Sequence, residues 1–110
     1  MIEKSLSENL LLKKITVSEL PDFINSAAFK AYSIKPISRL RAESYYKNPR
    51  AELNDYVVYT LEYKGNLLAF RTLLPDLVYE KDIKHKFAWC SGSWVHEKQR
   101  RKGFSKLILD

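Results

Sequence analysis

The hydrophobic and polar positions of this chain follow two different periods, and the change of period separates strands from helices. Residues 11–17, 56–63, 67–74 and 87–96 are rich in β-branched and aromatic residues, as is typical of half-buried strands. Between the first two of these strands, apolar residues recur at helical spacing and predict one helix with a core-facing stripe. That stripe consists of Leu20, Phe23, Ile24, Ala27, Ala28 and Ala31.

Proline and glycine mark where these elements end. The segment 32–36 is expected to break the helix, because the residue before a proline avoids the helical region. A second helix is predicted over residues 38–47, ahead of Asn48-Pro49. The sequence Lys64-Gly65-Asn66 is a tight-turn signal and predicts that the strands on either side form a hairpin.

Three further segments have weaker patterns. The first nine residues are mostly polar and predict a frayed or loosely helical start. Pro75-Asp76 predicts an interruption of the third strand, with residues 78–79 extending it past a bend. The run over residues 81–86 predicts a charged loop before the last strand.

After the last strand, apolar residues again fall at helical spacing. They predict the beginning of a third helix that has barely started at Asp110, through Phe104, Leu107 and Ile108. The predicted order is strand, helix, helix, three antiparallel strands and helix. This order indicates an α/β (α+β) fold with a mostly antiparallel sheet, in a single domain over residues 1–110.

The composition is sufficient for a hydrophobic core, and it excludes several classes of protein. Hydrophobic residues make up 45% of the 110 residues and aromatic residues 13%, which is enough for one packed domain. No apolar run approaches the roughly 18 residues that a membrane helix needs. The only cysteine, Cys90, cannot form an internal disulfide and favours a reducing, cytoplasmic location. Two histidines and one cysteine without paired spacing predict no metal site.

The net charge of +6 points to an anionic partner, which could be nucleic acid, anionic lipid or a phosphorylated ligand. Four basic residues gather where the last strand leads into the third helix: Lys98, Arg100, Arg101 and Lys102. Gly103 follows them and permits a tight turn. Free amides and the helix dipole at such a helix start favour an anion, so this placement favours a phosphate ligand.

These residues resemble the acyl-CoA pyrophosphate loop of the GNAT superfamily of N-acyltransferases. The family pattern is Arg/Gln-x-x-Gly-x-Gly/Ala, between the fourth strand and the third helix, and this chain has Arg100-x-x-Gly103-x-Ser105. Ser105 replaces the usual second small residue. Val95-His96-Glu97 is similar to the family's Val-x-Pro, with Glu97 where proline is common. The predicted order of elements matches the first half of the GNAT fold.

The resemblance implies that acetyl-CoA is the acyl donor and that a primary amine on a small molecule or a peptide is the acceptor. Backbone groups of Trp94 and Val95 would then bind the pantetheine arm. The pyrophosphate would be bound by Arg100, Arg101, Lys102, Gly103, Phe104, Ser105 and Lys106.

The resemblance also places the acceptor cleft beside the first two helices. It makes Arg41, Tyr45 and Tyr46 the candidates for acceptor contact. The catalytic base stays undetermined, because His96 and Glu97 lie near the right strand end but are of types usually found at the surface. Cys90 lies in an apolar strand, where a thiol is expected to be buried and inert.

The resemblance covers nearly the whole chain, but the chain covers only part of the family's domain. The family's later strands complete the CoA cleft, so residues 1–110 alone are expected not to catalyse transfer at an enzymatic rate. The last strand is expected to have an open edge, at which a second copy could pair to form a homodimer.

Two other classes of function compete with the acyltransferase. A nucleic-acid binder could use the basic residues together with Tyr45, Tyr46, Phe87 and Trp89 as stacking platforms. The strand patterning counts against it, because many aromatic residues are needed for the core. A noncatalytic interaction module that keeps only the fold is the other alternative.

Overall fold

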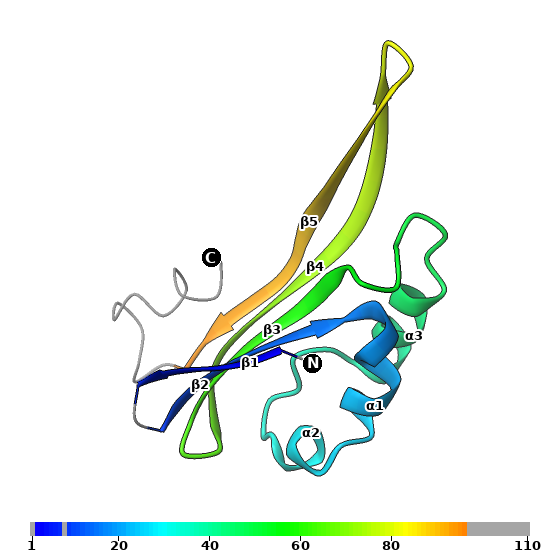
Figure 1. The fold of residues 1–110 in the computed structure, drawn as a ribbon. Helices are drawn as coiled ribbons and strands as arrows, with labels where there is room; N and C mark the ends of the chain where they lie inside the picture. The colour runs from blue at the N-terminus through cyan, green and yellow to red at the C-terminus, as the bar shows by residue number, and fades with distance from the viewer. Residues whose placement is uncertain (1, 8, 97–110) are drawn as a thin grey trace.

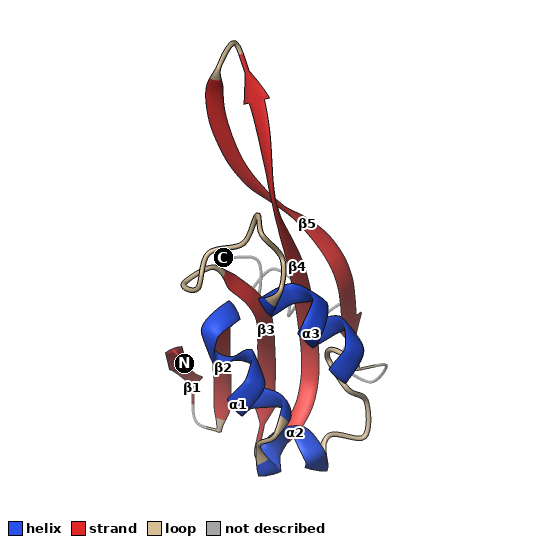
Figure 2. Ribbon diagram, turned by 90° about the vertical axis from the view of Figure 1, so that its right-hand side faces the viewer, coloured by secondary structure: helices blue, strands red, loops and turns tan. Residues whose placement is uncertain are grey.

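The computed structural model describes residues 2–7 and 9–96, which form an antiparallel sheet with helices on one face (Figures 1 and 2). The strands are β1 (Ile2–Ser7), β2 (Leu10–Thr16), β3 (Tyr56–Tyr63), β4 (Asn66–Glu80) and β5 (Ile83–Val95). The helices are a 3-10 turn η1 (Val17–Glu19), then α1 (Leu20–Ile24), α2 (Ala27–Ala31) and α3 (Arg39–Tyr46). The sheet order β1-β2-β3-β4-β5 follows the chain, and the predicted α+β class is confirmed.

The main core lies between the sheet and the three helices. Its fully buried side chains come from β2, η1, α1, the segment before α3, and β3: Ile15, Val17, Leu20, Phe23, Ile37, Val57 and Val58. A smaller cluster, built on Leu12, Leu61 and Ala69, lies on another part of the sheet. The helical pattern accounts for Leu20 and Phe23. Ile37 lies outside the helices and strands, and Val57 and Val58 are both buried although neighbouring strand residues face opposite sides.

Several predicted elements match the structure closely. The predicted strand over residues 56–63 is β3, and the predicted second helix is α3, whose N-cap Ser38 accepts a hydrogen bond from the Arg41 amide at 3.1 Å. Lys64 and Gly65 turn the chain between β3 and β4 with φ values of 50° and 82°. Positive φ at both positions is the geometry of a two-residue hairpin.

The prediction of a frayed or helical N-terminus is wrong, because residues 2–7 form the strand β1. This strand pairs with β2, with Glu3 directly opposite Lys13. Its polar residues suit an edge strand, which has a partner on one side only. The strand therefore depends on pairing with β2, and its own sequence gives little sign of it.

The prediction of one helix up to Ala31 is also corrected, because the helical stripe is divided between α1 and α2. Asn25 ends α1, and its side-chain amide donates to the carbonyl of Pro21 at 2.8 Å. Ser26 begins α2, where its hydroxyl accepts from the Phe29 amide at 3.2 Å. Asn and Ser side chains compete for backbone hydrogen bonds in this way, so this pair ends one helix and begins the next. Leu20, Phe23 and Ile24 of the predicted stripe are buried, but Ala27 and Ala31 are exposed, and α2 buries Phe29 instead.

The predicted interruption at Pro75 is wrong as well, because β4 continues through it to Glu80. β3 pairs with β4 only as far as Thr72, so Pro75 lies where β4 has a single strand partner among the described strands. A proline is tolerated at such an edge because its missing N–H breaks no ladder bond. The Asn48 side chain donates to the Pro75 carbonyl at 3.0 Å and holds the strand at this point.

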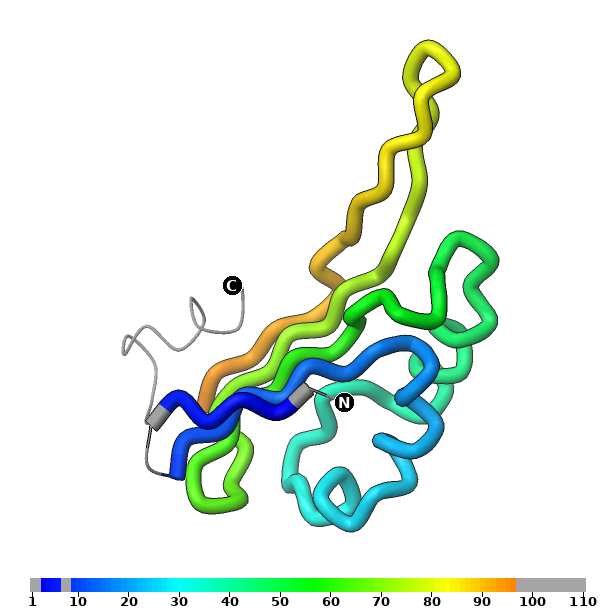
Figure 3. The backbone as a smooth tube through the Cα atoms, in the orientation of Figure 1, coloured from blue at the N-terminus to red at the C-terminus, as the bar shows by residue number. Residues whose placement is uncertain are grey.

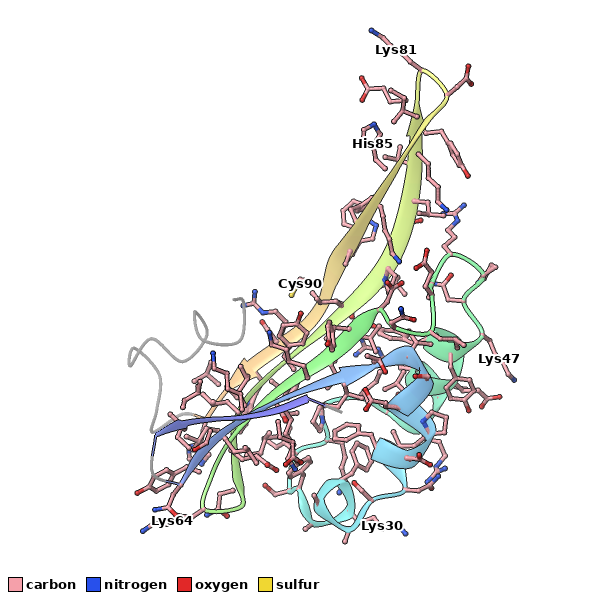
Figure 4. The ribbon with its side chains drawn as sticks, viewed as in Figure 1. Lys30, Lys47, Lys64, Lys81, His85 and Cys90 are labelled. Atoms are coloured by element: carbon pink, nitrogen blue, oxygen red, sulfur yellow. The ribbon has the colours of Figure 1, made fainter. Side chains whose placement is uncertain are left out.

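The predicted charged loop over residues 81–86 is reduced to the two-residue turn Lys81-Asp82, with φ values of 51° and 66°. β4 and β5 extend past the body of the sheet as a two-stranded arm, with Lys81 at its tip (Figures 1 and 4). Both faces of the arm tip are exposed to solvent, so the residues of its strands do not alternate between apolar and polar. The sequence pattern therefore did not predict these strands. At the arm's base, Asp76 accepts from the Leu77 amide, Trp89 and Arg50, which lowers its pKa below the ordinary value.

A buried polar network connects α2 to β2 and β3. The Tyr32 hydroxyl donates to the Glu62 carboxylate, and Lys13 Nζ lies 3.0 Å from the other Glu62 oxygen. Glu62 and Tyr32 are buried, and Lys13 is nearly so. Burial, and then the hydrogen bond and charge of Glu62, raise the pKa of Tyr32 above its ordinary value. The burial of these groups is tolerated because the charges of Lys13 and Glu62 offset each other and the Tyr32 hydroxyl has an acceptor.

The predicted third helix and the loop before it lie outside the described residues. Within the ranges that the structure describes, the longest helix, α3, has eight residues, and none reaches the length needed to cross a membrane.

Candidate functional site

A β-bulge in β5 is the centre of the candidate site. Thr72 of β4 lies opposite Gly92, but the next residue, Leu73, lies opposite Cys90. Ser91 is therefore an extra residue with no partner in the ladder. The bulge lies where β5 bends between the arm and the body of the sheet (Figure 3). A bulge re-aims the residues beside it, and here it turns Ser91 toward α3.

Four polar side chains meet at this bulge. Arg41 Nη2 donates to the Tyr45 hydroxyl at 3.0 Å and to the Ser91 carbonyl at 3.3 Å, and lies 3.4 Å from Thr72 Oγ1. The hydroxyls of Tyr45 and Ser91 are hydrogen-bonded, and Ser91 Oγ lies 3.0 Å from Thr72 Oγ1. We call Arg41, Tyr45, Thr72 and Ser91 the bulge cluster. It joins α3, β4 and β5.

Gly92 makes room for the bulge cluster. A Cβ atom at this position would lie 2.9 Å from Thr72 Oγ1 and 3.7 Å from Arg41 Nη1. Thr72 is fully buried and β-branched, so its hydroxyl has little freedom to move away. Glycine within a strand often marks such a close approach or a bulge.

We therefore expect Gly92→Ala to lower the free energy of unfolding by about 1–3 kcal/mol, the usual cost of overpacking. Urea denaturation followed by circular dichroism measures it. Ser93→Ala is the matched control, because Ser93 is the exposed neighbour of Gly92 in the same strand. An unchanged midpoint for Gly92→Ala would show that the cluster is loosely packed.

The three predicted acceptor residues behave differently. Arg41 and Tyr45 are one helical turn apart on α3 and both belong to the bulge cluster. Tyr46 is 38% exposed and has no hydrogen bond to this cluster. Arg41 and Tyr45 are therefore hydrogen-bonded to β5, whereas Tyr46 lies at the surface.

Trp94 and Val95, the predicted pantetheine-binding residues, lie at the end of β5. Trp94 stacks on Phe70, with ring centroids 5.9 Å apart, and Val95 lies opposite Ala69. β5 is the last strand of the described sheet, and no other described strand pairs with its outer edge. Alternate backbone groups of an edge strand face outward, where an extended ligand can pair with them.

The residues predicted to bind pyrophosphate lie outside the described part of the chain. They are Arg100, Arg101, Lys102, Gly103, Phe104, Ser105 and Lys106. They follow β5 directly in the sequence, after His96, whose amide donates to the Leu68 carbonyl at 2.6 Å. β5 therefore ends shortly before this segment of the sequence.

Cys90 is exposed, which corrects the expectation of a buried thiol. Its side chain points away from the helices, so it lies outside the bulge cluster (Figure 4). The register explains this, because Cys90 pairs with Leu73 on the face opposite to that of Thr72. Across residues 2–7 and 9–96, no three His, Cys, Asp or Glu side chains gather to hold a metal ion.

Of the four aromatic residues considered as stacking platforms, Tyr45 is only 3% exposed, so it cannot stack on a base. Phe87 and Trp89 pack edge to face at the base of the arm, 5.3 Å apart, and Trp89 is 58% exposed. Trp89 is therefore an exposed aromatic residue at the base of the arm, whereas Tyr45 belongs to the core.

Sequence reasoning missed Thr72, Ser91 and Gly92. The available signal was Gly92 in the interior of a predicted strand, flanked by two serines. The pattern could indicate a bulge, but it could not show that Arg41 lies against it, because 50 residues separate Arg41 from Ser91.

No protein-family model matches this chain, and no curated protein matches its sequence. Its structure is similar to that of an aminoglycoside acetyltransferase from an uncultured soil metagenomic sample. For that protein's complex with trehalose, the TM-score is 0.54 at 14% identity, covering 96% of this chain and 68% of that chain. For its complex with sisomicin, the TM-score is 0.51 at 18% identity, with the same coverage. This chain thus has an acetyltransferase-like fold.

Proposed function

We propose that this protein is an N-acyltransferase that transfers the acetyl group of acetyl-CoA to a primary amine. The observation that carries the proposal is β5, which bends at a bulge, is the edge strand of the described sheet and shortly precedes Arg100-x-x-Gly103-x-Ser105 in the sequence. The acetyltransferase-like fold supports it.

The shape of acetyl-CoA fits this arrangement. Its pyrophosphate is an anion suited to a basic, glycine-containing loop at a helix start. Its pantetheine arm contains two amides that can pair with an edge strand as another strand would. Residues 92–96 span about 13 Å at 3.3 Å per residue. A ligand held by its pyrophosphate in the loop and lying along β5 therefore brings its thioester toward the bulge.

The chemistry requires the amine nitrogen to attack the thioester carbonyl carbon. The C–N bond forms, the carbonyl oxygen gains negative charge, and the C–S bond then breaks to release the CoA thiolate. The amine loses a proton, and the thiolate takes one up. Backbone amides that are free of the ladder, as a bulge provides at Ser91, can stabilise the charged oxygen. The hydroxyls of Tyr45, Thr72 and Ser91 lie beside this point as hydrogen-bond donors.

The test is Gly103→Val with isothermal calorimetry of acetyl-CoA. A valine side chain should block the close approach of phosphate to the loop backbone, so we expect at least a tenfold loss of affinity. Gly65→Ala is the matched control, because Gly65 has φ of 82° in the β3–β4 turn, away from β5. That change should strain the fold and leave the affinity unaltered. Equal affinity of wild type and Gly103→Val, or no binding by either, would overturn the proposal.

A further inference from the structure

The Arg41 guanidinium has no carboxylate partner in the described part of the chain. Its contacts run through Nη2 to neutral oxygens of Tyr45, Thr72 and Ser91. Neither Nε nor Nη1 has a hydrogen-bond partner within residues 2–7 and 9–96. By contrast, Arg50 on the loop after α3 is paired with Asp76 at 2.7 Å. Arg41 therefore carries a partly exposed positive charge with free donors.

A structural role accounts for only part of these contacts. Holding the bulge closed requires a donor to the Ser91 carbonyl, which a neutral side chain could supply. A guanidinium offers five donors in a planar fork that matches a carboxylate in a bidentate pair. The side of Arg41 that faces Gly92 is already filled, because a Cβ atom there would lie 2.9 Å from Thr72 Oγ1 and 3.7 Å from Arg41 Nη1. A ligand would therefore approach Arg41 from its partly exposed side. The free side of Arg41 thus suits a carboxylate ligand.

The positive charge at the bulge cluster comes from Arg41. Arg71, the neighbour of Thr72 in β4, belongs to the other face of the sheet and adds no charge to this one. The whole chain also has a net charge of +6. Positive potential around the bulge attracts anionic ligands and repels polycations. This charge disfavours a polyamine such as sisomicin, which the structurally similar acetyltransferase binds.

We propose that Arg41 determines acceptor specificity by binding a carboxylate, and that the acceptors are free α-amino acids. The inference rests on the proposed function, which brings the thioester to the bulge. Arg41 itself contacts the bulge at the Ser91 carbonyl. The carboxylate it binds must therefore lie within a few ångströms of the attacking nitrogen, as the two groups of an α-amino acid do.

The experiment compares the twenty amino acids with their carboxamides, which keep the amine and lose the negative charge. Acetyl transfer is measured by thiol release from acetyl-CoA. In parallel, calorimetry in the presence of CoA measures binding of the N-acetylated acids and of their amides. For at least one amino acid, we expect kcat/KM to be at least about tenfold higher than for its carboxamide. We also expect the N-acetylated form of that amino acid to bind at least about tenfold more tightly than the N-acetylated carboxamide.

Arg41→Gln should abolish this preference, and Arg41→Lys, which keeps the charge without the fork, should retain part of it. Arg39→Gln is the matched control, because Arg39 is on the same helix and donates to Asn25 Oδ1 at 3.2 Å, outside the bulge cluster. It should keep the full preference. Thermal unfolding of each variant separates a loss of folding from a loss of specificity.

Equal values for acids and amides in the wild type would overturn this inference, and so would a preference that survives in folded Arg41→Gln. Faster transfer to sisomicin than to any amino acid would also overturn it. Each of these results leaves the acyltransferase function standing, as long as acetyl-CoA binds. Absence of acetyl-CoA binding overturns the function itself, and the acceptor assignment falls with it.

Discussion

Replacing Glu62 with alanine is expected to lower the free energy of unfolding by about 3–5 kcal/mol, the usual cost of breaking a buried ion pair. Lys13 Nζ, 3.0 Å from the Glu62 carboxylate, would be left as a nearly buried charge without a counter-ion. The Tyr32 hydroxyl would lose the acceptor that it donates to. Since a single domain is stable by only about 5–15 kcal/mol, this change alone could remove much of its stability.

Guanidinium denaturation, followed by tryptophan fluorescence and circular dichroism, measures the loss. Glu43→Ala is the matched control, because Glu43 forms an exposed pair with Lys47 on α3 and should have little effect on stability. The loss of stability in Glu62→Gln should be intermediate between those of Glu62→Ala and Glu43→Ala, since the glutamine amide oxygen still accepts a hydrogen bond from Tyr32. Similar losses for Glu62→Ala and Glu43→Ala would show that the network contributes nothing beyond a surface pair.

The second large effect is expected on ligand binding. Replacing Arg100, Arg101 and Lys102 together by alanine should weaken acetyl-CoA binding at least a hundredfold. Each well-placed charge-assisted contact is worth roughly 1.5–3 kcal/mol, and neighbouring contacts add incompletely. Pantetheine has the same arm without the nucleotide phosphates, so its affinity should change much less. Calorimetry of both ligands with the wild type and the triple variant measures the difference.

General electrostatic attraction must be separated from direct contact. The double variant Lys81→Ala/Lys84→Ala removes two exposed charges from the arm and should leave the affinity for acetyl-CoA nearly unchanged. Raising the salt concentration should reduce the effect of the triple variant only in part, because contacts to a bound ligand are screened less than distant charges. Identical losses for acetyl-CoA and pantetheine would instead indicate unfolding of the triple variant.

The fold was largely predictable where local pattern and tertiary packing agree. β3 begins and ends where its β-branched and aromatic residues do, and α3 begins at the serine that caps it. The hairpin turn follows from Lys64-Gly65, since glycine is the residue that takes up a positive φ most easily. These elements needed no information from the rest of the chain.

The elements that were predicted wrongly depend on distant partners. β1 is a strand because β2 offers it an edge, and β4 passes Pro75 because β3 has already ended. The charged residues from Lys84 onward form a strand because they pair with Tyr79 and its neighbours in the arm. Sequence periodicity records burial, so it is silent about strands whose faces are in solvent.

The candidate site divides in the same way. The phosphate loop could be predicted from the sequence because its residues are neighbours whose spacing a short motif records, and its role stays a prediction. The bulge cluster was not visible, because its residues come from α3, β4 and β5 and are far apart along the chain. A one-residue offset in the β4–β5 register turns Ser91 toward Arg41. Register is set by pairing between whole strands, so only the tertiary structure could decide which polar groups meet there.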